Sequence, residues 1–237
     1  MVESVKKRER HAVRPLRLKA KGADITKIKP LQNSLNLNIG SGIEHRKGWV
    51  NLDINEDTNP DKVADIRKLP YPDSTVDRIY LHHVLEHISG DLANVMQELY
   101  RVLKPGGSLE IHVPHFAFHG AHCHPEHVRR FDIHTFQHFT PSVLDDPKAQ
   151  QYPKPKCRFA IIHSEYRYRE IDHTNTKVKS WSKRQFIKAI DYMANKHKDS
   201  FDRFWCYWVG GCEEIIVLLT PIKPGIFLDS KTGKVIE

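Results

Sequence analysis

The feature that most constrains the fold is a strand-like segment that runs directly into two closely spaced glycines. Residues 35–39 read Leu-Asn-Leu-Asn-Ile, an alternation of apolar and polar side chains with the period of a half-buried β-strand. Gly40 and Gly42 follow at once, separated by one serine. Glycine allows a tight turn and a close approach of the backbone to a ligand. The sequence therefore predicts a strand that opens into a ligand-binding loop.

Further strand and helix patterns alternate along the chain. Apolar or alternating segments predict strands at residues 49–54, 62–64, 76–81, 108–113, 159–162 and 214–219. Apolar side chains at helical spacing predict helices at residues 91–103 and 181–197. Such alternation is typical of an α/β domain whose ligand lies beyond the carboxyl ends of parallel strands. We therefore predict a single domain with a doubly wound, mostly parallel, seven-stranded sheet.

Two aspartates at strand ends indicate what the glycine loop binds. Asp53 ends the second predicted strand, where it can accept hydrogen bonds from both hydroxyls of a ribose. Asp65 follows the third strand, where it can meet an adenine amino group. A dinucleotide-binding loop would place a third glycine at position 45, which is His45. A nucleoside pocket is therefore favoured, although each aspartate could instead cap a helix or form a turn.

Five segments of the chain together resemble the motifs of a known family. The segments that carry the resemblance are residues 35–42, 48–53, 65–70, 77–87 and 99–107. In this order they resemble the successive motifs of class I S-adenosylmethionine-dependent methyltransferases, in the branch with a short first loop and a Val-Leu-Glu-His segment after the fourth strand. The resemblance covers about residues 35–115 and implies a Rossmann-like methyltransferase fold with S-adenosylmethionine as cofactor.

The resemblance also implies roles for particular residues. The loop of Gly40 and Gly42 would face the methionine part of the cofactor, Asp53 would bind the ribose, and His82 would border the sulfonium. Asp65 and Ile66 would face the adenine. The family's acidic residue at the start of the glycine motif is Asn38 here, so an amide would replace a charge beside the cofactor's amino group.

The first crossover of the predicted sheet is unusually short. Only about ten residues separate the first two strands, near the lower limit for a parallel crossover. The first helix must then be very short or replaced by a loop, and residues 23–33 could supply some of its packing.

Histidines are concentrated after the fifth predicted strand. Eight of the sixteen histidines lie at positions 112, 115, 119, 122, 124, 127, 134 and 138. Zinc must be considered for such a cluster, but the spacing follows no regular ligand pattern, so no metal is predicted. We predict His115 and His127 as the catalytic pair, since neutral imidazole is a suitable base near pH 7. His83 and Arg129 are predicted to contact the substrate.

Positive charge is concentrated at the beginning of the chain. Residues 1–30 contain ten lysine and arginine side chains against three acids, so most of the net charge of +8 lies there. We divide the chain into this basic arm and a methyltransferase domain over residues 31–237, with its cofactor-binding half at 35–115 and its substrate-side half at 116–237. The arm could attract RNA or another polyanion, or simply be a solvated tail.

The leading hypothesis is methyl transfer to an oxygen or simple amine of a small-molecule or glycan-type acceptor. It is favoured because the [Asn/Asp]-Pro-Pro-[Tyr/Phe] motif of base-amino methylating relatives is absent after the fourth strand, where His82 and His83 stand. RNA methylation with the help of the arm, or a non-catalytic subunit of a nucleic-acid-containing assembly, stay open as alternatives. The absence of a signal peptide pattern, of a long apolar segment and of Cys-x-x-Cys pairs predicts a cytoplasmic protein without membrane contact.

Overall fold

The computed structural model describes residues 34–149, 155–168, 181–206, 212–224, 227–228 and 235–236. The basic arm, residues 1–30, and the segment 23–33 considered for packing lie outside the described residues. Within the described ranges, no helix combines the length and the apolar character needed to span a bilayer.

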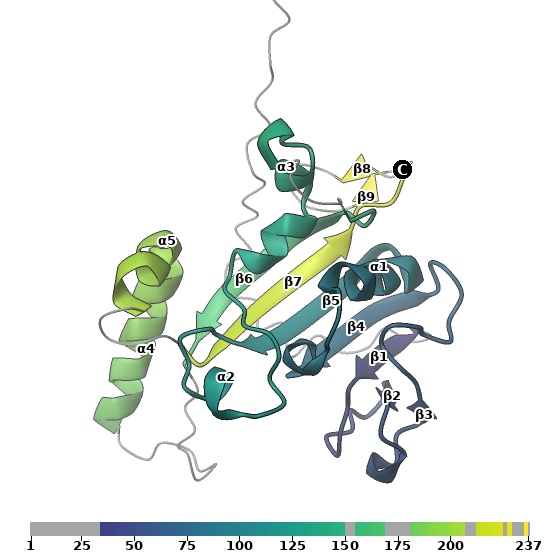
Figure 1. Cartoon of the computed structure of the whole chain (residues 1–237), viewed down its shortest axis with the longest axis horizontal. Coiled ribbons are helices and arrows are strands. Elements are labelled where there is room, and N and C mark those ends of the chain that lie inside the picture. Colours follow the sequence, from purple (N-terminus) through teal and green to yellow (C-terminus); the bar gives the residue numbers. More distant parts are fainter. Residues whose placement is uncertain are drawn as a thin grey trace, which may run out of the picture.

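One sheet organises the molecule (Figure 1). Its strands are β1 (Asn36–Ile39), β2 (Val50–Asp53), β3 (Lys62–Val63), β4 (Val76–His82), β5 (Leu103–Pro114), β6 (Phe159–Arg167) and β7 (Glu214–Pro221). Their order across the sheet is β3-β2-β1-β4-β5-β7-β6. The first five strands are parallel, whereas β7 is antiparallel to both β5 and β6. The predicted single-domain, seven-stranded, mostly parallel sheet is confirmed.

Helices and short pairings complete the described structure. The α-helices are α1 (Leu92–Val102), α2 (Gly120–Cys123), α3 (Pro141–Leu144), α4 (Trp181–Lys196) and α5 (Lys198–Ser200). Single tight turns of helix occur at η2 (Glu56–Thr58), η3 (Leu85–His87), η4 (Thr135–Phe139), η5 (Pro147–Ala149) and the wider η6 (Phe201–Trp205). A separate pair of strands, β8 (Phe227–Leu228) and β9 (Val235–Ile236), is antiparallel.

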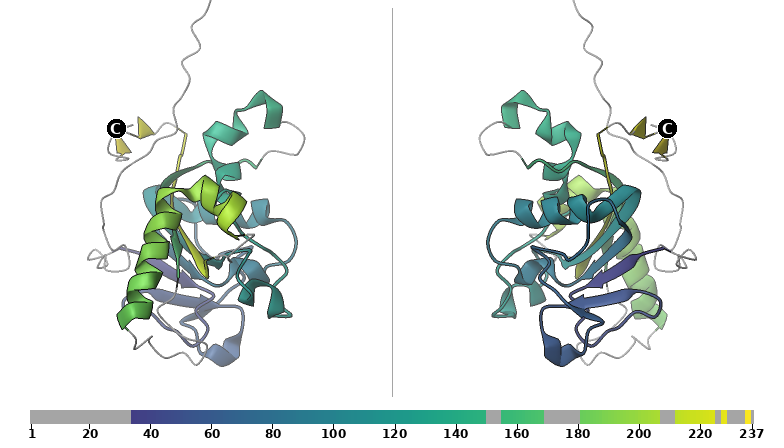
Figure 2. Two further views of the ribbon diagram at one scale, coloured as in Figure 1. Left: turned by 90° about the vertical axis from the view of Figure 1, so that its left-hand side faces the viewer. Right: turned by 90° about the vertical axis from the view of Figure 1, so that its right-hand side faces the viewer.

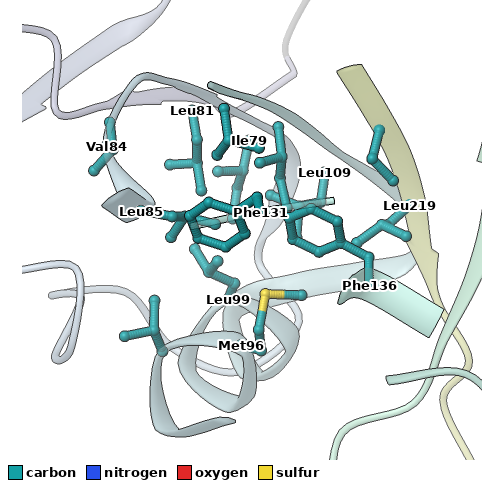
Figure 3. Packing of buried hydrophobic residues seen from close by; sticks show 14 of the residues in the cluster. Ile79, Leu81, Val84, Leu85, Met96, Leu99, Leu109, Phe131, Phe136 and Leu219 are labelled. Carbon is teal, nitrogen blue, oxygen red and sulfur yellow. The ribbon is translucent and has the colours of Figure 1, made fainter. Parts of the chain in front are cut away.

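Helix α1 packs the main hydrophobic core against the sheet. The carboxylate of Asp91 caps its first turn by accepting a hydrogen bond from the N–H of Ala93 at 2.9 Å. The stripe that faces the core consists of Val95, Met96, Leu99 and Val102, all buried. Figure 3 shows Met96 and Leu99 of this helix beneath Phe131 and Phe136, with the side chains of β4 and β5 on the other side of the rings. The predicted helix is confirmed, although the strand after it begins at Leu103 rather than at residue 108.

A loop replaces the first crossover helix, as the short spacing allows. Asn38 at 4% exposure holds this loop, because its Nδ2 donates to the carbonyl of Glu44 at 3.0 Å and to Oδ1 of Asn51 at 2.9 Å. The same Oδ1 accepts a hydrogen bond from the N–H of Arg46 at 2.8 Å. The side-chain amides of Asn38 and Asn51 thus hold the loop that stands in place of a crossover helix.

Helix α4 stands beside the outer strand of the sheet. It faces the viewer in the left-hand view of Figure 2 and lies behind the sheet in the right-hand view. Asn195 exchanges hydrogen bonds with both backbone groups of Tyr166 at 2.7 and 2.8 Å, and Asp191 accepts from the N–H of Tyr168 at 2.8 Å. These side chains satisfy backbone groups that an edge strand would otherwise offer to another chain.

Candidate active site

The glycine loop forms the centre of the candidate site, at the carboxyl ends of β1 and β2. Gly40 has φ +67°, and a Cβ there would lie 2.5 Å from Cγ2 of Val84, so a side chain fits neither the conformation nor the space. Gly42 has φ +49°, and the space where its Cβ would stand is open. Its N–H donates to Oδ2 of Asp53 at 2.7 Å, which joins the loop to the end of β2. The structure therefore brings the predicted glycine loop and Asp53 together.

The surroundings of Asp53 fit a nucleoside. Its carboxylate accepts hydrogen bonds from Gly42 and from the N–H of Asn55 at 2.9 Å, and both oxygens keep a further lone pair. Large apolar side chains stand exposed at the same sheet edge: Ile43 (88% exposed), Ile54 (68%) and Val63 (50%). Exposed apolar side chains beside a ligand site can cover the faces of an apolar ring. Open backbone, a part-buried carboxylate and bare apolar surface together match what an adenosine requires.

Of the other residues predicted to bind the cofactor, Asp65 is partly exposed, whereas Ile66 and Asn38 are buried. The carboxylate of Asp65 accepts a hydrogen bond from the N–H of Arg67 at 2.8 Å, which forms a turn. It also forms an ion pair with the guanidinium of Arg67 at 3.4 Å, and its side chain is partly exposed. Ile66 is 4% exposed and belongs to the hydrophobic core. Asn38 uses its amide nitrogen to hold the loop, as described above.

A buried glutamate gathers three histidines at the ends of β4, β5 and β7. The Oε1 atom of Glu214 lies 3.5 Å from Nε2 of His82 and 3.1 Å from Nε2 of His83, and its Oε2 lies 3.4 Å from Nδ1 of His112. Nδ1 of His83 lies 3.0 Å from Glu86, and Nε2 of His112 lies 2.8 Å from Glu110. His83 adopts φ +54°, a left-handed conformation that is uncommon for a residue other than glycine.

The cluster is a charged network. Burial alone lowers the pKa of His83, but the hydrogen bonds with Glu214 and Glu86 outweigh burial and raise this pKa to about 9. For His112, hydrogen bonds with Glu110 and Glu214 likewise outweigh burial and raise the pKa. Burial would raise the pKa of Glu214, yet the three histidines hold it well below its usual range. At neutral pH His83 is therefore an imidazolium ion beside a carboxylate, and His82 and His83 are both partly exposed whereas His112 is buried.

The predicted catalytic pair is not assembled. His115 is fully buried, its Nδ1 accepts a hydrogen bond from the N–H of Ala117 at 3.2 Å, and its Nε2 lies 3.1 Å from Asp202. Asp202 also accepts from the hydroxyl of Tyr166. Both ring nitrogens of His115 are engaged in this structure, where the side chain fixes the loop after β5.

His127 and Arg129 also differ from their predicted roles. His127 stacks on His124, with the ring centroids 4.6 Å apart, whereas His115 is paired with Asp202. The guanidinium of Arg129 donates to the carbonyls of Ile88 and Gly90, which ties the loop to the turn before α1. In this structure Arg129 therefore makes structural contacts, and its predicted contact with a substrate stays a prediction.

Sequence reasoning missed Glu214 and Ile54. A signal existed for Glu214, since a single charge opens an otherwise apolar final strand, and buried charges require partners. Ile54 follows Asp53 directly, and its exposure is visible only once β2 is known to end at Asp53.

Comparisons with known proteins agree with this geometry. Residues 41–111 match the methyltransferase domain family. A curated ubiquinone/menaquinone biosynthesis C-methyltransferase of Desulfotalea psychrophila is 41% identical over 46 residues, 19% of this chain. The match spans 18% of that relative, less than a fifth of its length.

The chain is also similar to solved structures. The YcgJ protein of Bacillus subtilis is similar over 81% of this chain and 93% of its own, with a TM-score of 0.50 at 17% identity. A SAM-dependent methyltransferase of Archaeoglobus fulgidus matches over 79% of this chain and 86% of its own, with a TM-score of 0.48 at 16% identity. The chain therefore shares its overall fold with the YcgJ protein, and residues 41–111 within that fold match a methyltransferase domain.

Proposed function

Because this chain carries a class I S-adenosylmethionine-dependent methyltransferase domain, we propose that it transfers a methyl group to an oxygen or simple amine of a small-molecule or glycan-type acceptor. The observation that carries the proposal is the hydrogen bond between Gly42 and Asp53 at an open sheet edge lined by exposed apolar side chains. This arrangement suits one nucleoside-type ligand and no pyrophosphate.

Each part of the cofactor has a matching group in the chain. Asp53 would accept hydrogen bonds from the ribose, and the backbone of Gly40 and Gly42 would lie against the methionine part. Ile54 and Ile43 would cover the faces of the adenine, with Asp65 near its amino group. When bound, S-adenosylmethionine supplies an electrophilic methyl group.

The remaining task of the protein is to align the acceptor and to remove its proton. We assign the proton to His82, whose Nε2 lies 3.5 Å from the buried carboxylate of Glu214. Such a carboxylate orients an imidazole and stabilises the imidazolium that forms. The neighbouring His83 already carries a proton at neutral pH, and its two ring nitrogens are paired with Glu86 and Glu214, so it would hold Glu214 in place rather than act as a base.

The test uses the full chain in two steps. Calorimetric titration with S-adenosylmethionine and with its demethylated product should show binding of both. Transfer of a labelled methyl group should then be measured with hydroxyl and amine acceptors. We expect His82→Ala to bind the cofactor like the parent and to lose on the order of 100-fold in turnover, the usual value of a positioned base. A parent protein that binds neither cofactor form would make the chain a non-catalytic subunit and defeat the proposal.

RNA methylation is a second candidate, favoured by one surface observation. Helix α4 exposes Trp181, Phe186 and Tyr192 (69%, 66% and 67% exposed). Arg184, Lys188 and Lys196 lie on the same helix. Aromatic side chains that alternate with basic ones suit single-stranded nucleic acid. RNA that accepts the labelled methyl group more efficiently than any hydroxyl or amine compound would select this candidate.

A further inference from the structure

Three histidines outside the cofactor site form a cluster that the proposed methyl transfer does not use. The ring of His127 lies 4.7 Å from that of His87 and 4.6 Å from that of His124, and the rings of His87 and His124 are 5.4 Å apart. One ring nitrogen from each histidine lies within 4.8 Å of the other two.

The backbone holds this cluster in place. The loop that follows β5 is closed at its neck, where the N–H of Phe116 donates to the carbonyl of Phe131 at 2.8 Å. Farther along the loop, the N–H groups of Val128 and Arg129 donate to the carbonyl of Glu86 at 2.9 and 3.3 Å. His127 therefore lies beside His87, because the backbone of Val128 is hydrogen-bonded to that of Glu86.

One ring nitrogen of the cluster is buried and has no partner among the described residues. This atom is Nδ1 of His127, and Oε2 of Glu86 nearby is in the same state. A buried polar atom without a hydrogen bond costs stability, so native proteins normally pair it with water, an ion or a ligand.

Among the described residues, two other groups of side chains could hold a metal ion, but their histidine nitrogens are already paired. Around Glu214, the imidazoles of His82 and His83 are already paired with the carboxylate. In the group of His115, Asp202 and Cys206, both nitrogens of His115 are engaged. At the cluster of His87, the carboxylate of Glu126 lies 4.0 Å from His87.

We propose that His87, His124 and His127 bind a zinc ion that joins the loop after β5 to η3. Imidazole nitrogen is a preferred zinc ligand, and three protein ligands leave the fourth tetrahedral position open. Zinc bonds of about 2.0–2.1 Å require nitrogens roughly 3.4 Å apart. The three atoms must therefore approach by at most about 1.4 Å, which side-chain rotation provides.

The sequence alone argued against a metal because the histidine spacing in the loop is irregular. The structure changes that argument, since the third ligand comes from η3, more than thirty residues earlier in the chain. Only His124 and His127 are close in sequence, and their Pro-Glu spacer matches no regular ligand pattern.

The test is a zinc titration of the full chain, purified without a polyhistidine tag and stripped with a chelator. Bound zinc is quantified by mass spectrometry, and affinity is measured by calorimetry. We expect stoichiometric zinc in the parent and at least a roughly 100-fold loss of affinity in His87→Ala and His124→Ala, because even the loss of a supporting residue costs about 10–100-fold. The matched control is His138→Ala, an exposed histidine of the same region, which should bind zinc like the parent.

Folding is checked with the thermal midpoint of each zinc-free variant, which should equal that of the zinc-free parent. His124 is exposed, so its variant decides the question if His87→Ala is unstable. Zinc should raise the midpoint of the parent and leave that of His124→Ala unchanged. Absence of stoichiometric zinc in the parent, or equal affinity in His124→Ala, would overturn the proposal. Zinc that is lost in His82→Ala but kept in His124→Ala would overturn it as well, because the ion would then lie at Glu214.

Discussion

Asp53 accepts two backbone hydrogen bonds and still has capacity for two more, which makes it the most informative single residue of the site. Asp53→Ala removes the acceptor for both ribose hydroxyls. Hydrogen bonds to a charged group are worth about 1.5–3 kcal/mol each, so binding of S-adenosylmethionine should weaken by at least roughly 100-fold. Calorimetry measures this loss.

The control for that substitution is Asp57→Ala, an exposed aspartate of η2 near the same edge, which should bind the cofactor like the parent. Far-ultraviolet circular dichroism should show both variants folded. Equal cofactor affinity of the two variants would remove Asp53 from the site.

At the residue scale, contacts between residues close in the sequence could be predicted, whereas contacts between residues far apart in the sequence were missed. Gly42 and Asp53 could be paired because consecutive parallel strands end at the same edge. The pairing of His83 with Glu214 spans 131 positions, and no short pattern encodes it. His115 was predicted as a base from its place after β5, but Asp202 and Tyr166, both far along the chain, complete its surroundings.

At the element scale, Glu214 connects β7 to the ends of β4 and β5. Its substitution should therefore change how stability depends on pH. The pKa of His83 is raised to about 9 in the folded state from an unfolded value near 6.5. This group stabilises the fold fully below about pH 6.5 and loses its contribution as pH rises through about 9.

In Glu214→Gln the pKa of His83 should fall toward its ordinary value. The parent should lose stability between about pH 6.5 and 9, on the order of 1–3 kcal/mol, whereas the variant should show a much flatter profile. Urea unfolding at several pH values measures this difference. Glu56→Gln, at an exposed position, should follow the parent. Parallel profiles for all three proteins would contradict the network.

Elements with strong periodicity were predicted well for a physical reason. The apolar stripe of α1 and the alternation of β1 reflect burial on one face, which the sequence records directly. The sequences of the loops after β1 and β5 have no such apolar periodicity. Their shapes depend on side chains such as Asn38 and Arg129 that bind backbone groups of other segments.

At the scale of the whole molecule, charge separates the arm from the domain. Deletion of residues 1–22 removes eight of the ten basic side chains of the arm. We expect cofactor affinity and thermal stability to stay unchanged, and binding to a polyanion such as poly(U) to weaken with a smaller salt dependence. Fluorescence anisotropy over a range of salt concentrations measures the slope.

A full-length variant with those eight lysines and arginines replaced by glutamine separates charge from length. It should bind poly(U) as weakly as the truncated chain. An unfolded truncated protein would show that the arm is part of the fold, and unchanged poly(U) binding would show that the contact lies elsewhere.

The closed neck between Phe116 and Phe131 has a consequence for how this molecule can diversify. Phe131 is buried in the core, and its backbone hydrogen bond with Phe116 holds the two ends of the intervening segment side by side. The segment therefore leaves the sheet and returns to it at fixed points. Exposed positions within it, such as His119 and Cys123, can change in evolution with little effect on the strands below.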